Sequence, residues 1–181
     1  MAKPSIIKAK VTDKKLLNHK ILHFEFTSKD NIDFTPGQYL SIKVDEYSYR
    51  AYSICKLLGK TFSIIASVEH EGLGSNYLKK LKVGDSIFGV GPRGKFNLKT
   101  TLSNNLVFIS TGTGIAPHIS FIDELINLKY KGNIEIIAGF RDECEIIFEK
   151  MLDNYKEKLN MEINYCLSKA TKSNYYLGRV T

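Results

Sequence analysis

The chain of 181 residues has few cysteines and histidines, and no apolar run long enough to span a membrane. Its three cysteines, Cys55, Cys144 and Cys166, are far apart and include no CxxC pair. This argues against a disulfide framework and against a zinc or iron–sulfur site. The four histidines show no metal-ligand spacing, and the N-terminus lacks the apolar core of a signal peptide. We therefore predict a cytoplasmic protein with no metal site and no membrane insertion.

Positive charge is in excess, with a formal net charge of +7. Such a balance suits nucleic acid, a membrane surface or an acidic protein as partner. The lysines are scattered, and the nearest approach to a cluster is Lys79, Lys80 and Lys82. No aromatic–basic binding motif accompanies them, which argues against nucleic acid.

The first half of the chain has the period of β-strands. Apolar residues alternate with polar ones over residues 22–26, 40–44 and 62–68, and turn signals such as Pro36-Gly37 separate these runs. Several short strands at this spacing predict a small antiparallel barrel or sandwich. One short helix is expected at residues 75–81, with Ser75 as its N-cap.

The pattern changes after a polar stretch at residues 97–105. Apolar strands are predicted at residues 106–110, 134–138 and 161–167, and they alternate with helices at residues 117–129 and 144–156. Strands that alternate with helices are typical of a parallel, doubly wound sheet. We therefore expect two domains, residues 1–99 and residues 100–181.

The predicted sheet has an open edge. The first strand is central in the usual doubly wound order, but only three strands precede Thr181. Val107, Phe108 and Ile109 would then lie on an apolar open edge, which invites aggregation. We expect that the α/β domain is incomplete at its C-terminus, so that the natural chain continues or a partner covers this edge.

A glycine turn, Thr111-Gly112-Thr113-Gly114-Ile115-Ala116-Pro117, joins the first of these strands to the following helix. Strand, turn and helix would aim backbone N–H groups and the positive helix end at one point, which suits a phosphate. Pro117 stands where the dinucleotide fingerprint has its third glycine, so the string alone is also compatible with a structural turn. The flanking strand and helix favour a nucleotide site.

A second constellation lies in the β domain. Arg50-Ala51-Tyr52-Ser53 offers a cation for a phosphate, a flat aromatic ring for stacking and a hydroxyl group for a ring nitrogen. Gly72-Leu73-Gly74-Ser75 precedes the short helix and could supply N–H groups to another phosphate. Tyr52 could also be an ordinary barrel tyrosine. Together with the glycine turn, the two motifs indicate two nucleotides bound face to face.

The order of these motifs resembles the ferredoxin–NADP reductase superfamily, in particular its bacterial-type ferredoxin or flavodoxin reductases. That family has a flavin-binding Greek-key barrel followed by a pyridine-nucleotide domain. The resemblance covers nearly the whole chain and rests on five motifs: Pro36-Gly37-Gln38-Tyr39, Arg50-Ala51-Tyr52-Ser53, Gly72-Leu73-Gly74-Ser75, Gly91-Pro92-Arg93-Gly94-Lys95-Phe96 and Gly112-Thr113-Gly114-Ile115-Ala116-Pro117.

The resemblance implies roles for these residues. Arg50 would contact the FAD pyrophosphate, Tyr52 would stack on the isoalloxazine, and Ser53 would form a hydrogen bond near flavin N5. Tyr52 and Ser53 are thus the expected catalytic residues. The other expected cofactor-binding residues of the two domains are Ile65, Ser67, Gly72, Gly74, Ser75, Thr111, Gly112, Thr113 and Gly114.

The choice of pyridine nucleotide depends on the ends of the later strands. An NAD site usually has an acidic residue after the second strand, but Arg141 stands there. The resemblance implies that Arg141, Ser168, Lys169 and Arg179 surround the 2′-phosphate of NADPH. Alternatively, Arg141 only caps its strand and Arg179 starts a helix, and NADH stays possible.

The resemblance implies an FAD-dependent oxidoreductase that transfers electrons between NADPH and a one-electron carrier such as ferredoxin or flavodoxin. A hydride would pass between nicotinamide C4 and flavin N5. Those carriers are typically acidic, which suits a basic reductase. Two alternatives are an electron-transfer subunit that serves a partner enzyme and a non-enzymatic flavin-binding module.

Overall fold

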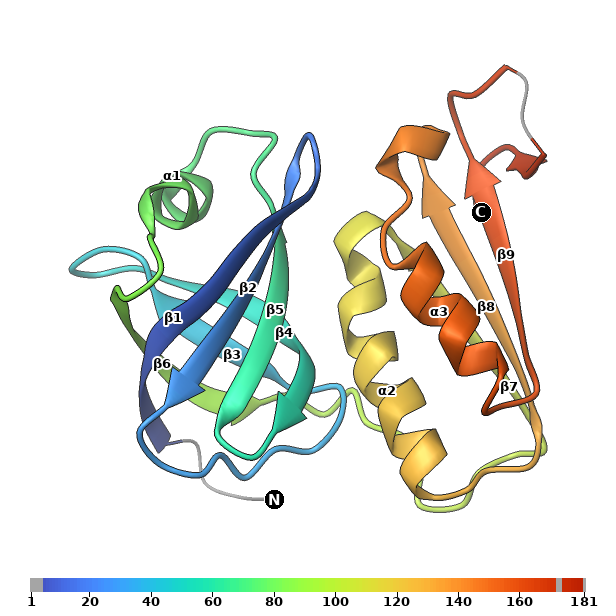
Figure 1. Cartoon of the computed structure of the whole chain (residues 1–181), viewed down its shortest axis with the longest axis horizontal. Helices are drawn as coiled ribbons and strands as arrows, with labels where there is room; N and C mark the ends of the chain where they lie inside the picture. The colour runs from blue at the N-terminus through green and yellow to red at the C-terminus, as the bar shows by residue number, and fades with distance from the viewer. Residues whose placement is uncertain (1–4, 172–173, 181) are drawn as a thin grey trace.

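A computed structural model describes residues 5–171 and 174–180 of the chain. Residues 1–4, where the sequence predicts no signal peptide, lie outside the described part. The chain forms a β-barrel and a separate α/β domain that stand side by side (Figure 1). Within the described residues, no helix combines the length and the apolar character needed to cross a membrane.

The N-terminal half is a closed antiparallel barrel, as expected, and not a sandwich. Its strands follow the order β1-β2-β5-β4-β3-β6 around the barrel. Alternation of apolar residues along each strand fills the interior, where the rings of Phe24, Phe26 and Phe62 stack in sequence. The strands are β1 (Ser5–Asn18), β2 (Ile21–Ser28), β3 (Tyr39–Lys43), β4 (Tyr49–Leu58), β5 (Thr61–Ser67) and β6 (Ser86–Arg93).

Helix α1 (Leu73–Lys80) covers one end of the barrel, but it begins earlier than the sequence predicts. Its N-cap is Gly72, which has no side chain to cap the helix, so the prediction of Ser75 as N-cap is wrong. The Ser75 hydroxyl instead donates to the Ser67 carbonyl oxygen at 3.5 Å. At the other end, Lys14 Nζ of β1 donates to three carbonyl oxygens of the last helical turn, those of residues 78, 79 and 81, at 2.7–3.2 Å. The helix is therefore tied to the barrel at both ends.

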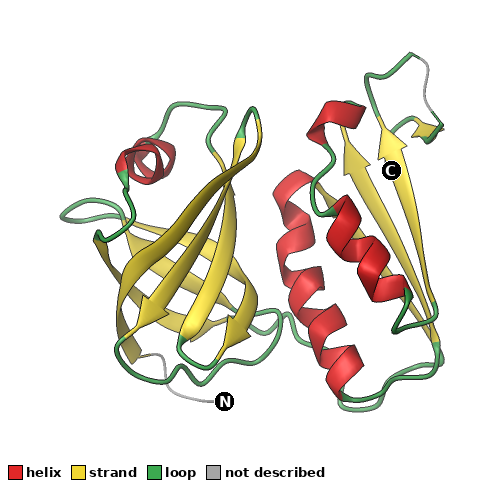
Figure 2. Cartoon of the chain, in the orientation of Figure 1, coloured by secondary structure: helices red, strands yellow, loops and turns green. Residues whose placement is uncertain are grey.

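The C-terminal half contains a parallel sheet, as predicted, in the order β10-β9-β8-β7. The expectation of only three strands before Thr181 is wrong, because the two-residue strand β10 pairs with β9 and is too short to show a sequence period. Among the described residues, both of its α-helices lie on the sheet face that is turned toward the barrel (Figure 2). The elements are β7 (Asn105–Thr111), η1 (Gly112–Ile115), α2 (Ala116–Asn127), β8 (Asn133–Phe140), η2 (Glu143–Glu145), α3 (Glu149–Lys156), β9 (Met161–Leu167) and β10 (Tyr176–Leu177).

Two helices differ from the prediction. Helix α2 begins at Ala116, one residue before Pro117, and ends at Asn127 rather than at 129. The helix expected at residues 144–156 is divided into the 3₁₀ turn η2 and helix α3. The division has a backbone cause, because Phe148 has a left-handed φ of 64° directly before α3.

Strand β7 is the outer strand of the sheet, as predicted, but not all of its apolar residues are exposed. Val107 and Ile109 are exposed, whereas Phe108 is only 9% exposed. Alternation turns Phe108 toward α2, where its ring stacks on that of His118 at 5.3 Å. The prediction of an exposed Phe108 is therefore wrong.

The two domains share a packed interface. Helix α2 packs on β4, and barrel residues such as Cys55 and Ile65 belong to the same apolar cluster as α2. The Gly37 N–H donates to the Ser120 hydroxyl of α2 at 2.9 Å. Gly37 has a φ of 94°, and a Cβ atom there would overlap the Phe96 carbonyl oxygen. The Pro36-Gly37 motif thus fits the barrel closely against the second domain.

Candidate functional site

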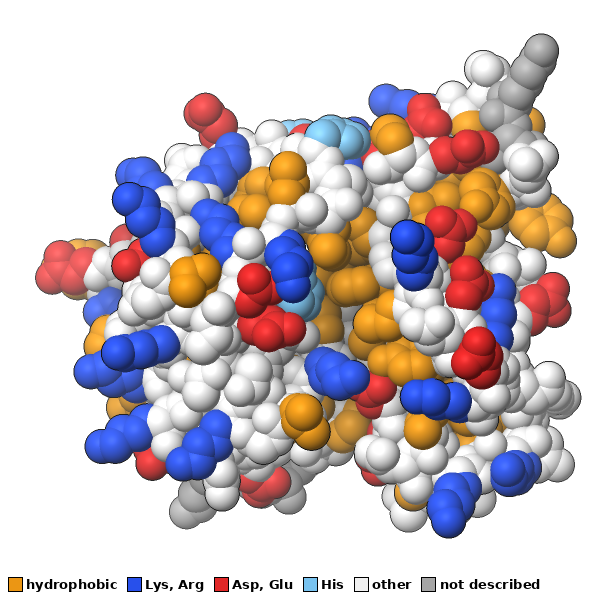
Figure 3. Space-filling view, in the orientation of Figure 1, with side chains coloured by type: hydrophobic (Ala, Val, Ile, Leu, Met, Phe, Trp, Pro, Cys, Tyr) orange, Lys and Arg blue, Asp and Glu red, His pale blue; other side chains and the backbone are white. Residues whose placement is uncertain are grey.

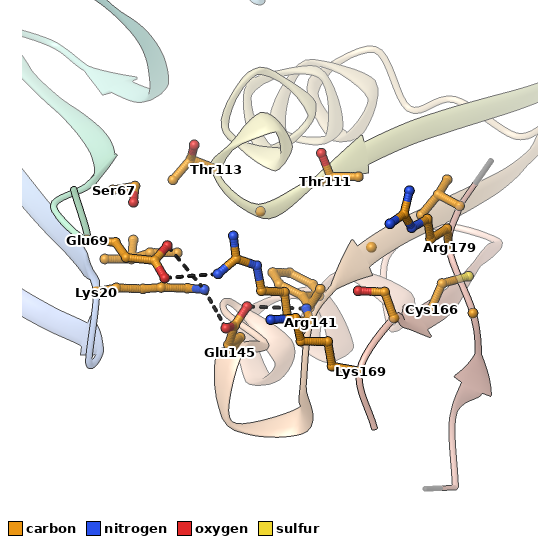
Figure 4. A pocket seen from close by; sticks show the side chains of 17 residues that line it. Lys20, Ser67, Glu69, Thr111, Thr113, Arg141, Glu145, Cys166, Lys169 and Arg179 are labelled. Atoms are coloured by element: carbon orange, nitrogen blue, oxygen red, sulfur yellow. Dashed lines mark hydrogen bonds and ion pairs between the residues drawn. The ribbon is translucent and has the colours of Figure 1, made fainter. Parts of the chain in front are cut away.

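A cavity of about 600 Å³ opens between the barrel and the carboxyl ends of β7, β8 and β9 (Figure 4). This volume lies within the range of small-molecule sites. Barrel residues Lys20, Ile21, Ser67 and Glu69 form one wall. The rest is lined by the α/β domain: Thr111, Gly112, Thr113, Gly139, Phe140, Arg141, Glu145, Cys166, Ser168, Lys169, Gly178, Arg179 and Val180.

The predicted glycine turn forms one end of this cavity. Strand β7 ends at Thr111, and Gly112 then turns the chain with a φ of 51° into η1 and α2. Apart from its chain neighbours and the backbone of η1, no described residue places an atom within 4 Å of the position that a Cβ atom of Gly112 would take. A ligand phosphate can therefore approach the backbone closely, at a place where the first N–H groups of a helix have no partner within it. Gly114 belongs to the same turn, but it does not line the cavity.

The structure brings the predicted cations Arg141, Lys169 and Arg179 together at this cavity, with Ser168. The Lys169 N–H donates to the Arg141 carbonyl oxygen at 2.8 Å, which joins the chain after β8 to the chain after β9. Lys169 and Arg179 are exposed, and Arg179 follows β10 in irregular backbone. Arg179 therefore starts no helix in the part of the chain that the structure describes.

An interdomain charge cluster, which we define as Lys20, Glu69, Arg141 and Glu145, was not predicted. Lys20 is only 8% exposed, and it forms ion pairs with Glu145 and, at 3.7 Å, with Glu69. Glu69 also accepts from Arg141 Nη1 at 3.0 Å, and Glu145 accepts the Arg141 backbone N–H at 3.2 Å. Desolvation opposes ionisation of Glu69, but Lys20 and Arg141 outweigh it and lower the pKa of this carboxyl.

The predicted flavin-binding motif, Arg50-Ala51-Tyr52-Ser53, lies on β4 of the barrel, next to the start of α1. A Cβ atom at Gly74 would lie 2.7 Å from the Tyr52 hydroxyl oxygen and 3.1 Å from Arg50 Cγ. A side chain at this position would push Tyr52 and Arg50 aside, so glycine allows the helix to lie this close to them. Burial raises the pKa of Tyr52, although Arg50 opposes the shift, so the phenol stays protonated at neutral pH. Arg50 is exposed, while Tyr52 and Ser53 are half-buried.

Ser67 and Ile65, on β5, have different surroundings. Ser67 lines the interdomain cavity and accepts the hydrogen bond from Ser75, so it links the start of α1 to the wall of this cavity. Ile65 is only 3% exposed, and its side chain packs in the interdomain apolar cluster. A contact between Ile65 and a cofactor stays a prediction.

One trio of side chains has metal-ligand geometry among the described residues. Ligand atoms of Asp13, His23 and Glu25 lie within 4.8 Å of one another. The Lys15 ammonium group, 2.8 Å from the Asp13 carboxylate, already supplies a cation there. We therefore assign no metal to this trio.

Comparison with known proteins decides the family. A family model of the oxidoreductase FAD-binding domain matches residues 8–98, and one of the oxidoreductase NAD-binding domain matches residues 108–181. The chain belongs to the ferredoxin–NADP reductase superfamily. Its barrel is thus of the FAD-binding type, and its α/β domain is of the NAD(P)-binding type. The open glycine turn and the closely packed Arg50, Tyr52 and Gly74 fit these cofactors.

Relatives in this superfamily are diverse. NADH-cytochrome b5 reductase 1 of Dictyostelium discoideum is 29% identical over 83% of this chain and 56% of its own length. The flavohemoprotein of Bacillus subtilis is 40% identical over 77% of this chain and 36% of its own length. The structure of ferredoxin–NADP⁺ reductase from Plasmodium falciparum superposes with a TM-score of 0.81 at 29% identity, over 94% of this chain and 74% of that one. The chain thus spans about half the length of the first of these relatives and about a third of the length of the second.

Proposed function

We propose that this chain is an FAD-dependent oxidoreductase that moves electrons between NADPH and a one-electron carrier. The observation that supports this most directly is the cavity of about 600 Å³ between the two domains. Its lining includes Ser67 of the flavin-binding barrel, the open turn at Gly112 and the cations after β8, β9 and β10. When bound, FAD supplies the chemistry by accepting a hydride from the nicotinamide and releasing electrons singly.

The protein residues position the cofactors in this proposal. Arg50 would pair with the flavin pyrophosphate, Tyr52 would stack on the flavin ring, and the Ser53 hydroxyl would form a hydrogen bond with it. The turn at Gly112 offers backbone N–H groups to the pyrophosphate of the pyridine nucleotide. No protein acid or base is required, because the protein contributes alignment and electrostatics.

The three cations Arg141, Lys169 and Arg179 favour NADPH, because a 2′-phosphate carries charge that the NADH ribose lacks. Lysine at 169 provides a point charge, whereas an arginine there could bind the phosphate with two parallel hydrogen bonds. We therefore expect a preference for NADPH that is moderate and does not exclude NADH.

An acidic protein such as ferredoxin or flavodoxin is the proposed carrier. Lys79, Lys80 and Lys82 are exposed at the end of α1, and the net charge is +7. Lys and Arg side chains are spread over the barrel in Figure 3. Such a surface attracts an acidic carrier and speeds association at low ionic strength.

The variant with Lys79→Glu, Lys80→Glu and Lys82→Glu tests this surface. At low salt we expect carrier reduction to slow by about tenfold, because electrostatic steering is reversed. A control with equal charge change, Lys29→Glu, Lys131→Glu and Lys158→Glu, reverses exposed lysines elsewhere. Equal rates for the two triple variants, in a stopped-flow assay with ferredoxin, would refute the proposed surface.

A second function is favoured by another relative. The anthranilate 1,2-dioxygenase electron transfer component of Acinetobacter baylyi is 27% identical over 84% of this chain. The chain would then pass electrons to a partner enzyme, and the exposed Val107 and Ile109 on β7 would be available to that partner. Native mass spectrometry of the complex from the source cell distinguishes the two functions, since only the second requires a stable partner.

A further inference from the structure

The interdomain charge cluster places a carboxylate of the barrel against the cation expected to bind the 2′-phosphate. Glu69 follows β5, Arg141 follows β8, and their charged ends lie 3.0 Å apart. In Figure 4 the two side chains extend toward each other across the cavity from opposite domains. Both are cavity-lining residues and remain partly accessible, with 30% and 47% of their side-chain surfaces exposed.

The charges of the cavity are unevenly balanced. The Lys20 and Arg141 cations are matched by the Glu69 and Glu145 carboxylates within the cluster. Within residues 5–171 and 174–180, by contrast, Lys169 and Arg179 have no ion-pair partner. A 2′-phosphate that binds here can therefore pair directly with Lys169 and Arg179, whereas Arg141 is already paired with Glu69.

This arrangement gives Glu69 an effect on nucleotide choice, provided that the proposed use of NADPH is correct. We propose that Glu69 is a specificity-determining residue that the barrel contributes to the 2′ end of the dinucleotide site. Arg141 must leave Glu69 in order to bind a 2′-phosphate, and the Glu69 carboxylate repels that phosphate. NADH, with a neutral 2′-hydroxyl, requires neither change. Glu69 thus narrows the preference for NADPH over NADH.

Binding of 2′,5′-ADP and 5′-AMP to the whole chain tests this role, because the two probes differ by the 2′-phosphate. In calorimetric titrations, Glu69→Gln should bind 2′,5′-ADP about threefold to tenfold more tightly than the unmodified chain. Its affinity for 5′-AMP should change less than about twofold. Glu71→Gln, which neutralises an exposed carboxylate in the same loop, is the matched control and should bind both probes normally.

A double-mutant cycle shows whether the effect passes through Arg141. In an Arg141→Gln background, the gain from Glu69→Gln should shrink, because no ion pair is left to break. Unchanged or weaker binding of 2′,5′-ADP by Glu69→Gln would overturn the proposal, and so would equal tightening of both probes. The proposal would also be overturned if Glu69→Gln lowered the melting temperature but left the ratio of the affinities for 2′,5′-ADP and 5′-AMP unchanged. The ion pair between Glu69 and Arg141 would then only stabilise the fold. Failure of the proposed function has a separate readout, since neither NADPH nor NADH would then reduce the bound flavin.

Discussion

His118 should make the stability of this protein sensitive to acid. Its imidazole is 3% exposed and lies on α2 among the rings of Phe96, Phe108 and Phe121, with centroids 5.3–6.1 Å away. Its Nδ1 atom has no hydrogen-bond partner in the described part of the chain. Burial lowers the pKa of His118 to about 4, because the imidazolium would lose its hydration there.

The direction in which stability changes with pH follows from the pKa of His118 in the folded and the unfolded chain. The unfolded chain, with a pKa of 6.5 at this histidine, binds the proton more readily than the folded chain does. The stability contribution is therefore complete above pH 6.5 and is lost as the pH falls from 6.5 toward 4. Between about pH 7.5 and about pH 4.5, the loss from His118 amounts to about 2–3 kcal/mol. This is a large share of the stability of an ordinary domain.

The substitution His118→Phe removes the titrating group and keeps a flat ring in the aromatic cluster. Urea unfolding at the two pH values measures the free energy of unfolding of each form. Acidification should cost the variant about 2–3 kcal/mol less than it costs the unmodified chain. His19→Phe, the same replacement at an exposed position, should keep the original pH dependence. Equal losses for the unmodified chain and His118→Phe would refute the assignment.

Two further substitutions test the contacts that hold the second domain and helix α1 against the barrel. Gly37→Ala should lower the free energy of unfolding by about 2 kcal/mol or more, because Gly37 has a positive φ and a Cβ atom there would overlap the Phe96 carbonyl oxygen. Gly59→Ala is the control, since Gly59 has a φ of 60° but open space around it, and it should lower the free energy of unfolding by less. An equal cost at both positions in urea unfolding would contradict this. Lys14→Met should weaken FAD retention by about threefold, because the last carbonyl groups of α1 lose their cation. Flavin fluorescence after dialysis measures this, with Lys10→Met as control; equal retention would count against the role of Lys14.

Local patterns were sufficient to predict the two domains and most strands. Alternation predicted the barrel interior, and the order strand, glycine turn and proline predicted the start of α2 within one residue. The start of α1 was missed because Gly72 offers no capping side chain, while the expected cap Ser75 bonds to Ser67 instead. The break before α3 was missed because phenylalanine rarely adopts the left-handed backbone of Phe148.

The candidate site could be predicted where its residues form linear motifs. The cations after β8, β9 and β10 meet because the carboxyl ends of parallel strands share one edge of the sheet. Lys20 and Glu69 belong to no such motif, since they come from a hairpin and a loop of the barrel. Their place beside Arg141 depends on how the two domains pack, and a single sequence does not show this.

The central claim is that this chain carries FAD and accepts electrons from NADPH. The most direct measurement is a visible spectrum of the purified protein, before and after anaerobic addition of NADPH or NADH. We predict a flavin spectrum that both nucleotides bleach, and that NADPH bleaches faster. A protein that stays colourless even after incubation with FAD would contradict the account, and so would a bound flavin that neither nucleotide reduces.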